Sequence, residues 1–208
     1  MLLGDLNTKK STDIENIAAW RQHLKEGFIA LKAEFLKSPN NTRLFKQHCK
    51  LIDQLLVEIW SQTQINQQCC LIAVGGYGRG ELYPYSDIDL LILIPENFVN
   101  DTTINSKLEL LIGLLWDIGL TVGHSVRTLT ECTEEAKKDI TVQTNLMESR
   151  FLTGDTPLYE KFICEINETL ADPEAVIKFY NAKLKTAATG TGSDRLCTCA
   201  WQPEPACW

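Results

Sequence analysis

The sequence has no apolar run long enough to cross a membrane. Its longest run, residues 90–95, has the length of a β-strand, whereas a spanning helix needs roughly 20 apolar residues. Residues 1–10 lack the apolar core of a secretory signal. The chain also lacks a long basic run, and its 208 residues carry a net charge of −7. These absences argue against membrane and nucleic-acid partners and predict a cytoplasmic protein.

Disulfides are not indicated, although the chain contains eight cysteines. Five of them stand singly or as one adjacent pair inside periodic segments, which is typical of reduced core residues. They are Cys49, Cys69, Cys70, Cys132 and Cys164. The other three lie in residues 186–208, where no fourth ligand at a usable spacing would complete a zinc site.

Apolar spacing predicts an α/β (α+β) chain in which helices precede and follow a small sheet. The first helix is expected to begin at a capping box formed by Thr12 and Glu15. Helices are predicted at 12–37, 42–67, 104–118, 129–138, 140–150, 157–169 and from Pro173 to 185. Strands are predicted at 71–74, 88–94 and 120–128, and residues 77–86 are rich in turn-forming residues.

Two aspartates at the entry of the second predicted strand are the main candidates for chemistry. Asp87 and Asp89 are two residues apart, so on a strand their side chains point to the same face. Carboxylates arranged in this way are ligands that Mg²⁺ uses while it shares its shell with water and phosphates. The pair predicts a metal site that acts on a triphosphate. The alternative is a solvated acidic turn.

The glycine-rich segment before these aspartates favours the metal interpretation. Gly75 and Gly76 have no side chains, so their backbone amides can approach phosphate oxygens. Arg79 can pair with a phosphate as a planar fork, and Ser86 either contacts phosphate or caps the turn. The alternative is a flexible surface loop. A Walker loop is excluded because no Gly-Lys-Ser/Thr is present, and Glu81 replaces the third glycine of a G-x-G-x-x-G motif.

A glycine pair followed by Ser-Asp-x-Asp resembles the DNA polymerase β nucleotidyltransferase superfamily. Five longer segments look like the bifunctional uridylyltransferase/uridylyl-removing enzyme family of bacterial nitrogen control. They are residues 74–82, 86–93, 115–117, 122–129 and 144–150. The resemblance covers roughly residues 15 to 185. It implies a polymerase β-like nucleotidyltransferase fold, with a small mixed sheet flanked by helices and with additional N-terminal helices.

The same resemblance implies a reaction and a set of site residues. The enzyme would transfer UMP from UTP to a tyrosine of the PII nitrogen-regulatory protein and release pyrophosphate. Asp87 and Asp89 would be the catalytic residues and the Mg²⁺ ligands. The nucleotide contacts would be Gly75, Gly76, Arg79 and Ser86.

Two features depart from the family pattern. The superfamily often has a third carboxylate on a neighbouring strand, but residues 120–128 contain none. His124 on that strand is either a proton acceptor or a packed histidine, and Asp117 and Glu131 flank the strand as weaker candidates. Residues 186–208 also differ abruptly in composition from the preceding chain, which suggests either a shifted reading frame or a loose natural tail.

We expect four regions from these patterns. They are an N-terminal helical region (1–68), a nucleotidyltransferase core (69–155), the start of a helical region (156–185) and a disordered tail (186–208). Family enzymes are several times longer and continue with hydrolase and glutamine-sensing domains. Two alternatives to an active uridylyltransferase therefore stay open. One is an inactive truncated remnant, and the other is a stand-alone enzyme that modifies a small molecule.

Overall fold

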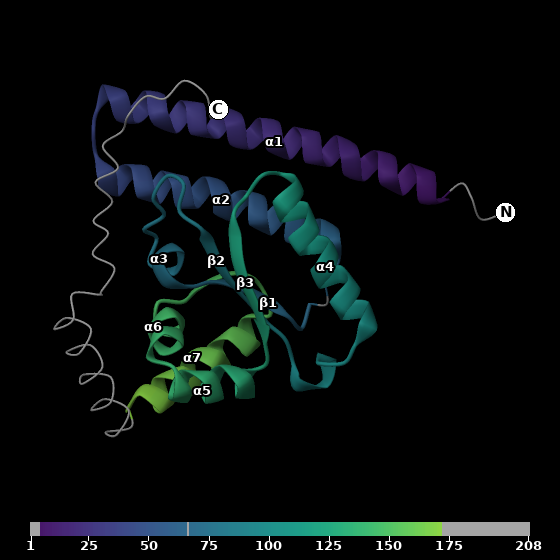
Figure 1. Cartoon of the computed structure of the whole chain (residues 1–208), viewed down its shortest axis with the longest axis vertical. Coiled ribbons are helices and arrows are strands. Elements are labelled where there is room, and N and C mark those ends of the chain that lie inside the picture. The colour runs from purple at the N-terminus through teal and green to yellow at the C-terminus, as the bar shows by residue number, and fades with distance from the viewer. Residues whose placement is uncertain (1–4, 66, 172–208) are drawn as a thin grey trace.

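A four-stranded mixed sheet lies between two layers of helices in the computed structural model, which describes residues 5–65 and 67–171 (Figure 1). β1 is antiparallel to both of its neighbours, β2 and β4, and β2 is parallel to β3. The order across the sheet is β3-β2-β1-β4. The strands are β1 (Cys70–Ala73), β2 (Ile88–Leu93), β3 (Val122–Arg127) and β4 (Arg150–Gly154). This arrangement confirms the predicted small mixed sheet flanked by helices.

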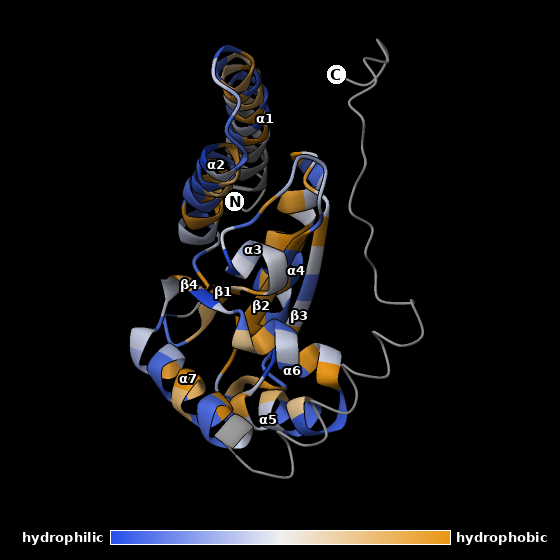
Figure 2. Ribbon diagram, turned by 90° about the vertical axis from the view of Figure 1, so that its left-hand side faces the viewer, coloured by the Kyte–Doolittle hydropathy of each residue, from blue (hydrophilic) through white to orange (hydrophobic). Residues whose placement is uncertain are grey.

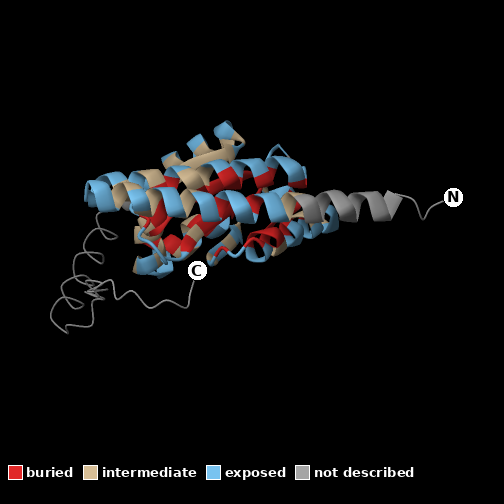
Figure 3. Ribbon diagram, turned by 90° about the horizontal axis from the view of Figure 1, so that it is seen from above, coloured by how far each residue is buried: buried red, intermediate tan, exposed pale blue. Residues whose placement is uncertain are grey.

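Two long N-terminal helices run antiparallel beside this core (Figure 1). α1 (Asp5–Lys37) and α2 (Asn41–Thr63) are separated by a short break, after which the Asn40 side chain accepts a hydrogen bond from the Arg43 amide and caps α2. Figure 3 shows that the outer side of α1 is exposed. The remaining helices are α3 (Gly75–Gly78), η1 (Glu96–Phe98), α4 (Thr102–Asp117), α5 (Leu129–Lys138), α6 (Ile140–Met147) and α7 (Thr156–Ala171).

The two central strands, β1 and β2, pack against both layers of helices. Alternate residues of β1 and β2, such as Leu71 and Leu90, pack with α2 and α4, whereas their neighbours, such as Ile72 and Leu91, pack with α5, α6 and α7. Because side chains alternate across a strand, a strand that is covered on both faces must be apolar along nearly its whole length. Figure 2 shows the resulting hydrophobic band through β1 and β2.

Several predicted boundaries are wrong. α1 already begins at Asp5, so Thr12 does not start it. The predicted helix at 140–150 ends at Met147, and strand β4 follows it. Cys164 is exposed, whereas Cys49, Cys69, Cys70 and Cys132 are buried free thiols as expected. The predicted helix after Pro173 and the tail at 186–208 lie outside the described residues.

Among the residues that the structure describes, no helix combines the length and the apolarity that crossing a membrane requires.

A network of polar side chains joins α2, α3 and β4. Arg150 donates two hydrogen bonds to Asp53, at 2.8 Å and 3.1 Å, and a third to the Tyr77 carbonyl oxygen at 3.3 Å. The Tyr77 hydroxyl donates to the same Asp53 carboxylate, and the Arg150 guanidinium lies 5.2 Å from the centre of the Tyr77 ring. Since the Tyr77 side chain is buried, this network fixes α3 against α2.

We predict that Arg150→Gln lowers the free energy of unfolding by about 2 kcal/mol, because it leaves the partly buried Asp53 carboxylate without its paired cation. The control is Arg79→Gln, which breaks more exposed ion pairs and is expected to cost less than about 1 kcal/mol. Urea unfolding followed by circular dichroism measures both. Equal losses in the two variants would contradict a special role of Arg150.

Candidate active site

The two aspartates lie where β2 begins. Asp89 is the second residue of the strand and alternates with Ile88 and Leu90, so it faces the side of the sheet that α5, α6 and α7 cover. Asp87 is exposed and Asp89 is half-buried. Burial, together with the neighbouring charge of Asp87, raises the pKa of the Asp89 carboxyl group. The two carboxylates are therefore close enough to repel each other.

The predicted glycine turn is the start of the short helix α3. Gly75 has a φ of +59°, a conformation that glycine adopts at little cost. Hydrogen bonds from the Gly78 amide to the Val74 carbonyl and from the Arg79 amide to the Gly75 carbonyl, both 3.0 Å long, wind the segment into a helical turn. The first amides of a helix have no acceptor within the helix, so those of Gly75 and Gly76 are suited to bind an anion.

Asp89 lies between this helix and the neighbouring strand. A Cβ atom built on Gly75 would lie 3.5 Å from Asp89 Oδ2. On the other side, Gly123 of β3 is paired with Asp89, and a Cβ atom there would lie 2.7 Å from Asp89 Oδ1. A side chain at position 123 would therefore collide with the carboxylate. The glycine leaves the space that Asp89 occupies.

No acidic side chain of β3 takes the place of a third carboxylate. His124 is exposed and its ring meets Trp116 edge-on at 6.2 Å, on the α4 side of the sheet, whereas Asp89 faces the other side. Glu131 accepts a hydrogen bond from the Thr128 amide and completes the capping box of α5. Asp117 is exposed at the end of α4. His124 thus packs against Trp116 and Glu131 caps α5. Neither contact involves Asp87 or Asp89.

Arg79 and Gly78 connect α3 to the end of α6. The Arg79 guanidinium pairs with Glu81 at 3.1 Å and with Glu148. A Cβ atom on Gly78 would lie 1.7 Å from the Glu148 carbonyl oxygen, so no other residue fits there without a backbone shift. Arg79, predicted to contact phosphate, is already paired with two carboxylates.

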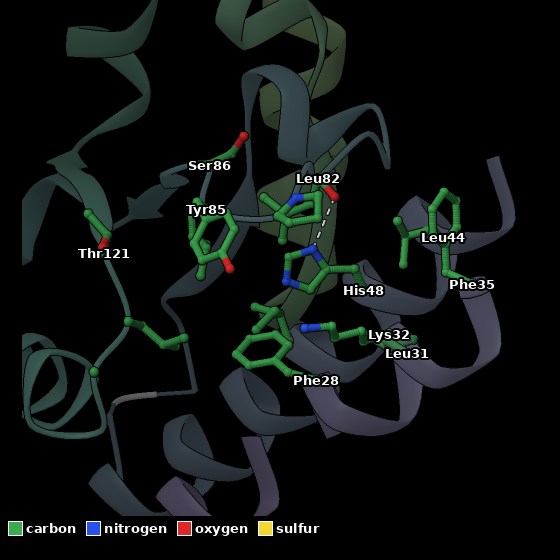
Figure 4. Close-up of a pocket in the computed structure, with 15 residues that line it drawn as sticks. Phe28, Leu31, Lys32, Phe35, Leu44, His48, Leu82, Tyr85, Ser86 and Thr121 are labelled. Atoms are coloured by element: carbon green, nitrogen blue, oxygen red, sulfur yellow. Dashed lines mark hydrogen bonds between the residues drawn. The ribbon is translucent and has the colours of Figure 1, made fainter. Parts of the chain in front are cut away.

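Ser86 lies at the edge of a cavity of about 400 Å³ between the α1–α2 pair and the loops that lead into β2 and β3. Figure 4 shows its hydroxyl directed away from His48 and Lys32, which line the cavity. The structure thus brings Gly75 and Asp89 together, with Asp87 beside Asp89, while Ser86 directly precedes Asp87 and borders the cavity.

Two residues near these sites were missed from the sequence. His48 is buried, and its Nδ1 lies 3.1 Å from the Leu82 carbonyl oxygen, which holds the loop that leads to Asp87. Its polar character within the apolar stripe of α2 was a usable signal. Asn145 of α6 lies beside Gly75, with its Oδ1 3.4 Å from the Cβ position built there. It lies in the segment 144–150 that resembles the uridylyltransferase family, but residue type and spacing alone gave it no role in the site.

The donor set around Asp89 fits a hard divalent cation. Carboxylate oxygens are preferred Mg²⁺ ligands, and a cation relieves the repulsion between two neighbouring carboxylates. Within residues 5–65 and 67–171, no group of three or more His, Cys, Asp or Glu side chains is arranged to hold a metal. A cation at Asp87 and Asp89 would therefore complete its shell with other oxygen donors, such as water and phosphate.

A family model, described as the nucleotidyltransferase domain, matches residues 46–149, which is half of the chain. The mixed sheet, the short glycine helix after β1 and the aspartate pair at the start of β2 agree with the polymerase β-like fold of that class. The chain belongs to the nucleotidyltransferase domain family.

Relatives with curated names point to one kind of nucleotidyltransferase. The chain is 43% identical over 166 residues to the bifunctional uridylyltransferase/uridylyl-removing enzyme of Nitrosospira multiformis, and 41% identical over 167 residues to the enzyme of that name from Aromatoleum aromaticum. These matches cover 78% and 80% of this chain but only 18% and 19% of the relatives. The chain therefore spans less than a fifth of their length.

One solved structure, described as a toxin-antitoxin with AMP-PNP, aligns with a TM-score of 0.37 and 16% identity over 67% of this chain and 95% of that one. A similarity of this size carries no argument about either fold or function.

We predict that Gly78→Ala lowers the free energy of unfolding by about 3 kcal/mol or more, because the new methyl group collides with the Glu148 carbonyl oxygen. Gly113→Ala is the matched control. Gly113 lies within α4 with no atom near its Cβ position, so alanine is expected to stabilise the chain there by about 0.5–1 kcal/mol. Thermal unfolding measures both, and opposite signs are expected.

We also predict that His48 makes stability depend on pH. Burial lowers the pKa of the His48 imidazole below 6.5, although the hydrogen bond to the Leu82 carbonyl partly opposes this shift. The unfolded chain then binds a proton more readily than the folded chain, so stability falls as the pH drops from about 6.5 toward the lowered pKa.

Urea unfolding between pH 7.5 and pH 5.5, values chosen at about one unit on either side of the ordinary histidine pKa, tests this dependence. His48→Gln is expected to reduce the slope of stability against pH. His23→Gln, which changes an exposed histidine of α1, is expected to leave it unchanged. The same slope in His48→Gln and the unmodified chain would refute the assignment.

Proposed function

We propose that this chain binds UTP with Mg²⁺ and transfers UMP to a tyrosine hydroxyl of a PII nitrogen-regulatory protein in the cytoplasm. The observation that carries the proposal is the position of Asp89, enclosed between the first residue of the glycine helix and Gly123 of β3, with Asp87 beside it. The relatives that match this segment are named uridylyltransferases, which favours UTP over other nucleotides.

In this proposal, side-chain carboxylates bind the cation and backbone amides bind the phosphates of the nucleotide. Asp87 and Asp89 would hold the cation, and the amides of Gly75 and Gly76 would donate to phosphate oxygens. When bound, Mg²⁺ neutralises phosphate charge and stabilises the leaving pyrophosphate. Ser86 directly precedes Asp87, so its amide or its hydroxyl would be a further donor to phosphate.

The transfer is an in-line displacement. A bond forms between the tyrosyl oxygen and the α-phosphorus, the bond to the bridging oxygen of pyrophosphate breaks, and the tyrosyl proton is lost to solvent. In reactions of this kind, positioning and charge neutralisation provide most of the rate. The rigid start of β2, fixed by β1 on one side and β3 on the other, is suited to positioning. The uridylyl-removing reaction named in the relatives is not part of this proposal.

We predict that Asp87→Asn combined with Asp89→Asn weakens Mg²⁺–UTP binding by at least about 100-fold, because loss of groups that merely support metal ligands already costs about 10–100-fold. The control combines Glu109→Gln with Glu160→Gln, which removes the same charge from exposed helical positions. Isothermal titration calorimetry measures binding, and transfer of label from UTP to purified PII measures the reaction.

The two measurements separate the alternatives. Binding that is unchanged in the aspartate variant would mean that the site is misassigned. Binding that depends on both aspartates, without any transfer to PII, would identify a nucleotide-binding remnant and refute the transfer reaction. Transfer to a small aminoglycoside acceptor in place of PII would favour a stand-alone enzyme.

A further inference from the structure

We propose that Asn145 of α6 supplies a third protein oxygen to the cation that Asp87 and Asp89 hold. The inference rests on the proposed function, because it concerns the metal of that same site. Asn145 is half-buried, and α6 is separated from β2 by 46 residues of chain or more. The fold therefore brings Asn145 close to Asp89 from a distant part of the chain.

The two side chains converge on one point. The Cβ position built on Gly75 lies 3.4 Å from Asn145 Oδ1 and 3.5 Å from Asp89 Oδ2. These distances set an upper limit on the separation of the two oxygens that is larger than the about 4.2 Å between opposite ligands of an octahedral Mg²⁺ ion with metal–oxygen distances of about 2.1 Å. Shared ligation therefore requires the Asn145 side chain to turn toward Asp89 when the cation binds. Both oxygens are acceptors, so a cation suits the space between them better than another acceptor would.

The position of Asn145 is fixed from α3. Three residues further along the chain, the Glu148 carbonyl oxygen packs against Gly78, and the Glu148 carboxylate pairs with Arg79. Within α6 the Glu148 amide donates to the Thr144 carbonyl oxygen at 3.2 Å. Because α3 begins at Gly75, these contacts hold the last turn of α6 beside the glycine that both oxygens approach.

The residue of the neighbouring strand that is paired with Asp89 cannot provide this oxygen. Gly123 is the residue of β3 that is paired with Asp89, and its Cβ position lies 2.7 Å from Asp89 Oδ1. A carboxylate at that position would displace Asp89 from its observed place. A ligand at position 123 is thus excluded, whereas α6 lies on the side of Asp89 that Gly75 borders.

A carboxamide oxygen has a specific consequence for the charge of the site. It adds a hard ligand without adding negative charge, so the protein would offer the cation two carboxylates and one neutral carbonyl oxygen. A third carboxylate at the same position would bind the free cation more tightly. This difference makes Asn145→Asp an informative counterpart to Asn145→Ala.

The experiment uses the full chain and Mn²⁺ alone, which favours the same carboxylate and carbonyl donors as Mg²⁺. Electron paramagnetic resonance of free Mn²⁺ gives the dissociation constant, and competition with Mg²⁺ shows that the site accepts both ions. Asn145→Ala is expected to weaken Mn²⁺ binding about tenfold. Asn145→Asp is expected to bind at least as tightly as the unmodified chain. The matched control, Asn105→Ala, changes an exposed asparagine of α4 and is expected to have no effect.

Each outcome decides between the inference and the proposed function. Unchanged Mn²⁺ affinity in Asn145→Ala, or equal weakening in Asn145→Ala and Asn145→Asp, overturns the role of Asn145. If Asp89→Asn still loses Mn²⁺ in that case, the proposed site stands without it. If neither Asp89→Asn nor Asn145→Ala changes the affinity, or if the unmodified chain does not bind Mn²⁺, both proposals fail. Thermal unfolding of each variant identifies any loss that comes from misfolding, in which case Asn145→Asp alone decides.

Discussion

The site depends on the narrow space that two glycines leave around the Asp89 carboxylate. Gly75 borders one side of it and Gly123 the other, and a Cβ atom at position 123 would lie within 2.7 Å of a carboxylate oxygen. This constraint also fixes the pairing of β2 with β3. A shift of one residue would bring Val122 or His124 opposite Asp89, and either side chain would turn toward the wrong face of the sheet. The pairing register of β2 with β3 and the position of the Asp89 carboxylate therefore depend on each other.

The N-terminal helices support this arrangement from the far side of the sheet. Asp53 of α2 holds Arg150 and the Tyr77 hydroxyl, so α2 determines where α3 lies and hence where Gly75 meets Asp89. His48, five residues earlier in α2, contacts the loop that enters β2. The matched family domain begins at residue 46 and so includes most of α2 but none of α1. α1 nevertheless contributes walls of the cavity beneath that loop, which makes it part of the same packing unit.

The sequence revealed the parts of this structure that depend on local patterns. Both apolar strands are visible as short uninterrupted apolar runs, and the shared face of Asp87 and Asp89 follows from side-chain alternation. The helical form of α3 was missed because glycine has a poor helix propensity, and it is the close approach of Glu148 to Gly78 that accounts for the glycine there. Strand β4 was missed because its five residues show no clear alternation and are ordered by pairing with distant β1. The position of Asn145 arises only from the packing of α6 on α3.

The distribution of charge explains how an acidic chain can be suited to a triphosphate. Arg79 is the cation closest in sequence to the glycine helix, but Glu81 and Glu148 already compensate its charge. Arg150 is likewise committed to Asp53. These two arginines therefore add little positive potential that is available to phosphates. Neutralisation would fall to a divalent cation on the aspartates and to the free amides at the start of α3. On this view Arg79 acts mainly by joining α3 to the end of α6, so that the amides, the aspartates and Asn145 keep their relative positions when a highly charged ligand arrives.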